Sequence, residues 1–379
     1  MNAEQLAAEL RPKVRASMAD IRSGLDRLVR IPSMSAAGYD AAQVRRSADL
    51  TAELFGAAGV QARVVGRDGA HPAVVGRVEG PPGTPTVLLY AHHDVQPPGP
   101  RERWRTDPFE PVERDGRLYG RGASDDKAGI AAHLAALRAY GGTPPCGVAL
   151  FIEGEEESGS AHLMDYLAAE RATLQCDAVI IADSSNWRIG RPAITTTLRG
   201  NAQVKVEVRV ADHAVHSGAY GGTVPDALMA LARVLASLHD DRGRVAVAGL
   251  RSGDTDGLDL TEEELRGYVG TRPSVTLIGD GSITSRMWTK PSISIIGLDA
   301  TPVSEASNTL WPVAAAQLSM RVPPGQDATA AQDALVAHLG SHVPWGAELS
   351  ITRGSTGEAF TGSTSGPAYT ALREALGAA

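Results

Sequence analysis

The pattern of apolar and polar positions divides the chain into two regions of different character. In the first half, three continuous apolar runs predict strands at 86–91, 147–152 and 177–181, and the run at 86–91 is typical of a sheet that is buried on both faces. Shorter strands are predicted at 61–66 and 73–78. Amphipathic or alanine-rich stretches predict helices over 1–30, 41–58, 126–140 and 162–170. Strands that alternate with helices in this way are typical of an α/β domain with a mostly parallel sheet flanked by helices.

After about residue 190, polar and apolar positions alternate instead. Alternation predicts strands at 202–210, 273–278, 292–297 and 315–321, and helical patterns cover 223–239 and 327–340. Such strands with two helices indicate an inserted α+β domain built on an antiparallel sheet. A last helix is expected at about 365–377. The predicted organisation is therefore a first domain over 1–195, an inserted domain over 196–355 and a return to the first domain over 356–379.

Composition and charge narrow the class of protein. With 379 residues, of which 43% are hydrophobic, the chain can bury a large core and favours two domains. The formal net charge of −8 argues against a nucleic-acid partner. No apolar run reaches about 18 residues, so no membrane span is expected. The charged, amphipathic N-terminus is unlike a signal peptide, and the two cysteines, Cys146 and Cys176, suggest no disulfide framework, so we expect a cytoplasmic protein.

Acidic and histidine residues follow each of the three apolar strands. In an open α/β sheet, ligands bind at the carboxyl ends of the strands. A further acidic pair, within GRGASDDKAG at 120–129, stands where the helix over 126–140 begins. The candidate residues are His92, Asp94, Asp125, Glu156, Glu157 and Asp183. We expect them to meet at one edge of the sheet.

This set of side chains has the chemistry of a metal site. Mixed imidazole and carboxylate ligands suit zinc, cobalt or manganese better than calcium or magnesium. One histidine with several carboxylates suits two ions roughly 3.5–4 Å apart. Such a site also needs a carboxylate that is not a ligand to take a proton from water, and an adjacent glutamate pair can supply one ligand and one base. Each motif alone is more often a solvated acidic turn or a helix cap, so the hypothesis depends on their joint occurrence.

Five ordered motifs resemble those of the zinc-dependent exopeptidase family, which includes carnosinase, bacterial dipeptidases, acetylornithine deacetylase and succinyl-diaminopimelate desuccinylase. The motifs are HHDVQPPG at 92–99, GRGASDDKAG at 120–129, EGEEESGS at 153–160, the strand end at Asp183, and HSGAYGG at 216–222. The DVQPP form and the DPFEP stretch are most similar to the carnosinase and dipeptidase branch. The resemblance implies a catalytic domain interrupted by a lid and dimerisation domain.

The resemblance also implies a role for each candidate ligand. His92 and Asp183 would bind the first metal, Glu157 the second, and Asp125 both. Two divalent ions are implied, zinc first, with cobalt or manganese as alternatives. Asp94 would orient the imidazole of His92. Glu156 would be the general base.

Three residues of the inserted domain are implied to complete the site. His216 would reach the active site of the partner subunit in a homodimer and stabilise the oxyanion of the substrate. Asn308 and Arg321 match positions that contact the substrate in the dipeptidase branch. The guanidinium of Arg321 suits the terminal carboxylate of a peptide.

The implied reaction is hydrolysis of the peptide bond of dipeptides or short peptides by a metal-bridging water, with Glu156 as base. Two alternatives stay open. The first is a deacylase of the same family that removes acetyl or succinyl groups from N-acyl amino acids. The second is a catalytically impaired, truncated protein that dimerises or binds without catalysis.

The second alternative arises because the sequence departs from the family near its end. The family's second metal has a further histidine ligand close to the C-terminus, preceded by a glycine-rich segment that binds substrate. Here no histidine follows His342, and the chain stops in a helix. The resemblance therefore indicates a truncated chain whose second metal would keep only Asp125 and Glu157.

Overall fold

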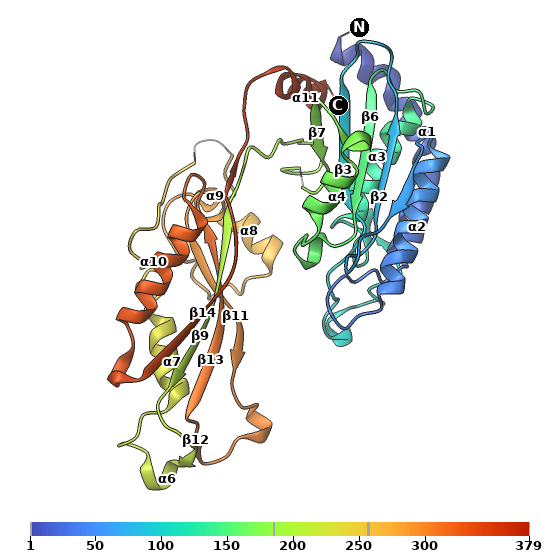
Figure 1. Ribbon diagram of the computed structural model, residues 1–379. Helices are drawn as coiled ribbons and strands as arrows, with labels where there is room; N and C mark the ends of the chain where they lie inside the picture. The colour runs from blue at the N-terminus through green and yellow to red at the C-terminus, as the bar shows by residue number, and fades with distance from the viewer. Residues whose placement is uncertain (1, 185, 256–257, 379) are drawn as a thin grey trace. The chain divides into compact units, whose positions relative to one another are not determined.

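The computed structural model describes residues 2–184, 186–255 and 258–378. They form two compact units, shown in Figure 1. Unit 1 comprises Met1–Ile194 and Ser365–Ala379, and unit 2 comprises Thr195–Thr364. The return to unit 1 comes later than the predicted boundary at 355. The reason is that β14 (Glu348–Gly357) is still part of the unit 2 sheet, and β15 (Phe360–Thr361) then pairs with β8 (Thr197–Leu198).

Unit 1 is built on a five-stranded sheet in the order β1-β2-β6-β3-β7. The strands are β1 (Arg63–Val65), β2 (Ala73–Val78), β3 (Thr86–His92), β6 (Gly147–Glu153) and β7 (Ala178–Ile181). β3 pairs in parallel with both β6 and β7, whereas β2 is antiparallel to its neighbours β1 and β6. All strands except β2 therefore run in one direction, which confirms the mostly parallel sheet.

Helices cover both faces of this sheet. On one face lie α1 (Ala3–Val29), α2 (Ala41–Ala57) and α3 (Lys127–Ala139), whose apolar side chains share a core with Leu150 and Ile152 of β6. On the other face, Tyr166 of α4 (Leu163–Ala169) and Leu174 of α5 (Arg171–Leu174) pack with Ala149 and Phe151. Because successive residues of a strand point to opposite faces, a strand between two cores must be apolar on both sides, and β6 is apolar from Gly147 to Ile152. Its seven residues are all buried.

The apolar strand predicted at 177–181 is β7, but its side chains are largely exposed. Val179, Ile180 and Ile181 are 53%, 42% and 61% exposed. β7 is the outer strand of the sheet and pairs with β3 alone. Within the part of the chain that the structure describes, no element pairs with its outer edge.

The remaining elements of unit 1 are short, apart from the last helix. They are η1 (Arg101–Arg103), the hairpin of β4 (Val112–Arg114) and β5 (Arg117–Tyr119), and the 3-10 turn η2 (Glu156–Ser158). α11 (Pro367–Ala378) ends the described chain, and its Ala378 carbonyl oxygen accepts a hydrogen bond from Arg11 of α1 at 3.1 Å. None of the helices in the described ranges is both long and apolar enough to cross a membrane.

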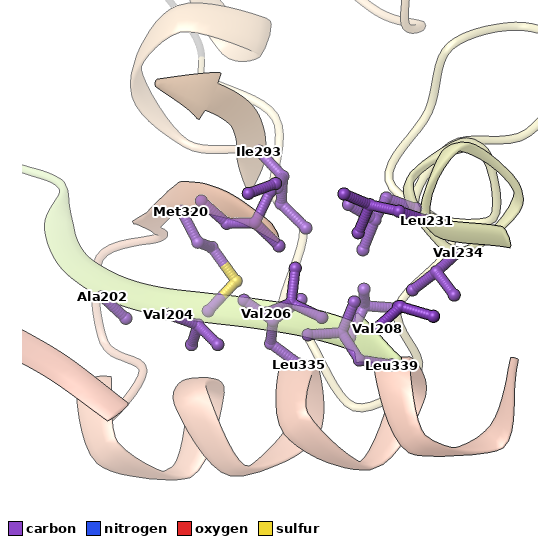
Figure 2. Packing of buried hydrophobic residues seen from close by; sticks show 14 of the residues in the cluster. Ala202, Val204, Val206, Val208, Leu231, Val234, Ile293, Met320, Leu335 and Leu339 are labelled. Atoms are coloured by element: carbon purple, nitrogen blue, oxygen red, sulfur yellow. The ribbon is translucent and has the colours of Figure 1, made fainter. Parts of the chain in front are cut away.

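Unit 2 contains a four-stranded antiparallel sheet in the order β11-β13-β9-β14. Besides β14, the strands are β9 (Gly200–Arg209), β11 (Ser292–Asp299) and β13 (Val313–Val322). Two helices, α7 (Ala227–Ala236) and α10 (Ala328–Ser341), pack their apolar side chains on one face of the sheet. Figure 2 shows Val204, Val206 and Val208 of β9 in this core. The antiparallel sheet with two helices is as predicted.

One predicted strand of unit 2 is absent, and one strand of its four-stranded sheet was not predicted. Residues 273–278 form no strand; they lie between α8 (Glu262–Val269) and α9 (Ile283–Trp288), with Val275 and Ile278 exposed. Alternation was misleading here because the apolar side chains of the segment, Val275 and Ile278, are exposed and do not pack in a core. The fourth strand is β14, whose sequence is mostly polar.

His216 belongs to a group of three short elements. β10 (Val215–His216) pairs with β12 (Thr309–Leu310), and α6 (Ser217–Tyr220) follows β10 directly. The 3-10 turns η3 (Val303–Glu305) and η4 (Pro344–Gly346) complete the unit.

Candidate metal centre

The carboxyl ends of three neighbouring parallel strands meet at one edge of the unit 1 sheet. His92 is the last residue of β3 and is paired with Glu153, the last residue of β6. Asp183 follows β7 by two residues, and Asp125 stands just before α3. The topology therefore gathers residues that lie far apart in the sequence, as the strand ends predicted.

Three of the candidate ligands form one group. The imidazole Nε2 of His92 lies 3.1 Å from Asp125 Oδ1 and 3.8 Å from Asp183 Oδ2. One ligand atom from each residue lies within 4.8 Å of the others. Ligand atoms at about 2.0–2.2 Å from a tetrahedral zinc ion are about 3.3–3.6 Å apart, so these three side chains fit such an ion with small adjustments. Among the described residues, no other group of three histidine, cysteine or acidic side chains meets this spacing.

Asp94 holds His92 in the orientation that this group needs. Nδ1 of His92 lies 3.2 Å from the Asp94 carbonyl oxygen and 3.3 Å from Asp94 Oδ1. When Nδ1 carries the proton, the lone pair of Nε2 is free to bind a metal ion on the side of Asp125 and Asp183. Asp94 Oδ2 accepts hydrogen bonds from the hydroxyl of Ser35 at 2.6 Å and from the N–H of Glu157 at 3.0 Å.

The electrostatics of the group favour a positive charge at its centre. Burial alone would lower the pKa of His92, but the hydrogen bond to Asp94 and the surrounding carboxylates raise it to about 10. Burial raises the pKa of Asp183, and the neighbouring Asp125 raises it further. A bound cation would occupy the same field of negative charge and relieve the repulsion between the carboxylates. The donor set and its charge therefore fit a divalent ion.

Glu156 lies beside the group without belonging to it. Its Oε2 is 3.9 Å from Nε2 of His92, and its side chain is 38% exposed. Burial raises the pKa of Glu156 to about 7, and the negative charges of Asp183 and Glu157 act in the same direction. A carboxylate of this kind, close to a metal group but free to exchange a proton, has the properties of a general base.

Glu157 is the candidate ligand of a second ion, together with Asp125. Both carboxylate oxygens of Glu157 accept hydrogen bonds from Gln96. Burial raises the pKa of Glu157, the bonds from Gln96 lower it, and the charge of Asp125 raises it.

The two acidic residues before α3 are separated in function by the fold. Asp125 is directed to His92, whereas Asp126 caps α3 by accepting from the N–H of Gly129 at 3.2 Å. Asp126 Oδ2 also accepts from the N–H of His92 at 3.2 Å, so the cap ties the start of α3 to the end of β3. The peptide bond between the two residues is cis. The buried ammonium of Lys127, the next residue, donates to the carbonyl oxygens of Leu28 and Ile31.

Ser35, Gln96 and Lys127 support this centre but are not among the predicted site residues. Gln96 and Lys127 stand inside two of the motifs, beside the acidic residues that were predicted. Ser35 lies in a loop that carries no motif, and only its contact with Asp94, which is far away in the sequence, reveals its role. No sequence signal indicated that contact.

The other predicted site residues belong to unit 2. The Nδ1 of His216 accepts from the N–H of Gly218 at 3.1 Å, and the N–H of Ser217 donates to the carbonyl oxygen of Asn308 at 2.9 Å. The β10–β12 pairing thus brings His216 and Asn308 together. Arg321 is exposed near the end of β13, opposite Ser292 and Asn201.

Comparison with known proteins identifies the class to which this fold and site belong. The family model described as "Peptidase family M20/M25/M40" matches residues 88–379. The chain belongs to this peptidase family. The family predicted from the motifs is thereby confirmed.

Two of the relatives that the chain matches are dipeptidases. The chain is 36% identical over 305 residues to the cysteinylglycine-S-conjugate dipeptidase of Corynebacterium striatum, a match that covers 78% of this chain and 67% of that protein. It is 30% identical over 286 residues to the Beta-Ala-His dipeptidase of Homo sapiens, covering 71% of this chain and 56% of the relative. The match thus spans about half to two thirds of these two relatives.

Solved structures share the fold. Human carnosine dipeptidase 1 superposes with a TM-score of 0.80 at 25% identity, covering 94% of this chain and 82% of that chain. The dipeptidase Dug1p of Saccharomyces cerevisiae also gives a TM-score of 0.80, at 22% identity, covering 98% of this chain and 83% of that chain. These comparisons confirm the predicted fold class.

Proposed function

We propose that this protein is a dipeptidase that depends on two divalent metal ions, of which zinc is the first choice and cobalt or manganese the alternatives. The observation that carries the proposal is the convergence of His92, Asp125 and Asp183 at the carboxyl edge of the sheet, with the free carboxylate of Glu156 beside them. The named relatives, which are dipeptidases for cysteinylglycine conjugates and for Beta-Ala-His, support the choice of substrate class.

His92 and Asp183 would hold the first ion, Glu157 the second, and Asp125 both. When bound, the ions supply Lewis-acid polarisation of the scissile carbonyl and lower the pKa of a nearby water. Asp94 keeps a proton on Nδ1 of His92, so that Nε2 stays available as a ligand.

Glu156 is the proposed general base. Its Oε2 takes the proton of the attacking water and then gives it to the nitrogen of the leaving amine. Its position beside the three-residue group, within 4 Å of Nε2 of His92, supports this role. Its partial exposure allows a substrate to reach it.

We also propose that His216, Asn308 and Arg321 act on the substrate, His216 from the partner subunit of a homodimer that forms through unit 2. An N–H of His216 would stabilise the oxyanion, and Arg321 would bind the terminal carboxylate. The apolar surface of unit 2 supports association: Tyr220, Met229 and Trp345 are each more than half exposed, and the last two line one groove with Leu310. A cytoplasmic location fits the two free cysteines.

The test is hydrolysis by the purified chain after chelation and return of zinc, manganese or cobalt. Dipeptides such as Cys-Gly and β-Ala-His should be cleaved and N-acetyl or N-succinyl amino acids should not; the reverse preference would make the protein a deacylase. Equal inactivity of the wild type and Glu156→Gln at saturating metal would favour the non-catalytic alternative.

A further inference from the structure

The carboxylate of Glu157 is held by a residue that no family motif assigns a role. The backbone N–H of Gln96 donates to Glu157 Oε1 at 3.2 Å, and the side-chain Nε2 of Gln96 donates to Oε2 at 2.8 Å. The same Nε2 lies 2.9 Å from the Glu157 carbonyl oxygen. Each carboxylate oxygen therefore has its own donor, and both donors come from one residue.

The local backbone explains why Gln96 reaches Glu157. In extended chain, residues two apart point to the same side, so Asp94 and Gln96 face one way and Val95 faces the other. Val95 is fully buried, and its N–H donates to the Ser33 carbonyl oxygen at 3.0 Å. Asp94 meanwhile accepts from the N–H of Glu157. The segment after β3 therefore fixes Glu157 twice, at its backbone through Asp94 and at its side chain through Gln96.

A carboxylate held in this way can still bind an ion. Its two oxygens offer about four lone-pair sites, and the bonds from Gln96 occupy two of them. A free glutamate side chain would lose rotamer freedom on binding an ion, whereas one already held by donors has lost it beforehand. Partners of this kind around a metal ligand orient it and tune its affinity.

We propose that Gln96 is a positioning residue for the second divalent ion, acting through the carboxylate of Glu157. This inference rests on the proposed two-ion function. It predicts a site-specific effect, because Gln96 hydrogen-bonds to Glu157, which is the proposed ligand of the second ion and not of the first.

The test compares Gln96→Leu with Gln175→Leu, a matched change at an exposed glutamine of the same unit. Each folded protein is stripped with a chelator and dialysed against graded free zinc, and bound zinc is measured by elemental analysis. Gln96→Leu should weaken binding of the second equivalent by about 10–100-fold and leave the first unchanged. Gln175→Leu should match the wild type. Gln96→Asn, which keeps the amide on a shorter side chain, should fall between.

Either of two results with Gln96→Leu would overturn the inference. One is an unchanged affinity for the second ion; the other is an equal loss of affinity for both ions together with a lower melting temperature, which would show a role in folding. A wild type that binds one ion only would overturn it as well, since Glu157 would then have no ion to hold. Failure of the proposed function looks different: the wild type would bind two ions and show the Gln96 effect, yet cleave no dipeptide.

Discussion

The central strands β6 of unit 1 and β9 of unit 2 differ in how their residues are buried. All seven residues of β6 are buried, whereas β9 alternates between buried and more exposed positions. Helices cover both faces of the first sheet, so polar groups are confined to the ends of its strands, and the parallel direction of β3, β6 and β7 brings those ends together. Within the described residues, α7 and α10 share a core with one face of the second sheet, and the other face carries the polar residues of β9. The first arrangement concentrates chemistry at an edge of the sheet, and the second gives the sheet one apolar and one polar face.

The largest effect should come from the edge of the first sheet. Glu156→Gln removes the proposed base but keeps the size of the side chain, and we expect kcat for dipeptide hydrolysis to fall by about 10²–10⁴. The circular dichroism spectrum should not change, because Glu156 packs in no core. A variant that retains more than a tenth of wild-type kcat would remove Glu156 from the mechanism and leave the edge of the sheet without a base.

Alanine substitutions along the two central strands should differ in pattern. In β6, the neighbouring changes Leu150→Ala and Phe151→Ala should each lower the free energy of unfolding by about 2–5 kcal/mol, because both faces are core. In β9, Val206→Ala should cost about 2 kcal/mol, but its exposed neighbour Lys205→Ala should stay within about 0.5 kcal/mol. Urea unfolding measures all four. If Phe151→Ala lowered the free energy of unfolding no more than Lys205→Ala does, the conclusion that β6 packs in a core on both faces would be wrong.

Removal of the metal should change hydrogen exchange in unit 1 but not in unit 2. Zinc at about one hundred times its Kd stabilises the folded site by about 2.7 kcal/mol. Hydrogen exchange should therefore slow in β3 and at the start of α3 when zinc is added to the chelated protein. The amides of β9 serve as the internal control and should not respond. Equal protection of both units would mean that the ion acts on more than the centre around His92.

The smallest effect should come from a buried histidine of unit 2. Burial lowers the pKa of His338, and His342, stacked on it with ring centroids 4.0 Å apart, lowers it further. The unfolded chain, with a histidine pKa of about 6.5, therefore binds the proton more strongly than the folded chain, so this residue reduces stability as the pH falls below about 6.5. The gap in unfolding free energy between the wild type and His338→Gln should narrow by less than about 1 kcal/mol from about pH 8 to about pH 5.5. A gap that stays constant would show that His338 stabilises by packing alone; His213→Gln, at an exposed site, is the control.

The parts of the fold that could be predicted are those with a strong local pattern. β3 and β6 are continuous apolar runs, and the residues after them, His92 and the Glu156–Glu157 pair, follow from where those runs stop. The pairing of strands that are distant in the sequence left no comparable pattern in the sequence. β14 is mostly polar and yet pairs with β9, whereas the described segment 273–278 alternates and yet forms no strand.

Contacts between distant segments limited the prediction of the site as well. Ser35 and Asp94 are far apart in the sequence and meet only because an isolated bridge joins Met34 to Val95. The exposure of Val179 and Ile181 likewise depends on the place of β7 at the edge of the sheet, which composition does not specify.

The most direct test of the central claim is anomalous diffraction at the zinc absorption edge from crystals grown with zinc. We predict a strong peak within about 2.0–2.2 Å of His92 Nε2, Asp125 and Asp183, and a second peak between Asp125 and Glu157. Data from His92→Ala should lose the first peak. A zinc peak elsewhere in unit 1 with none beside His92 would contradict the account.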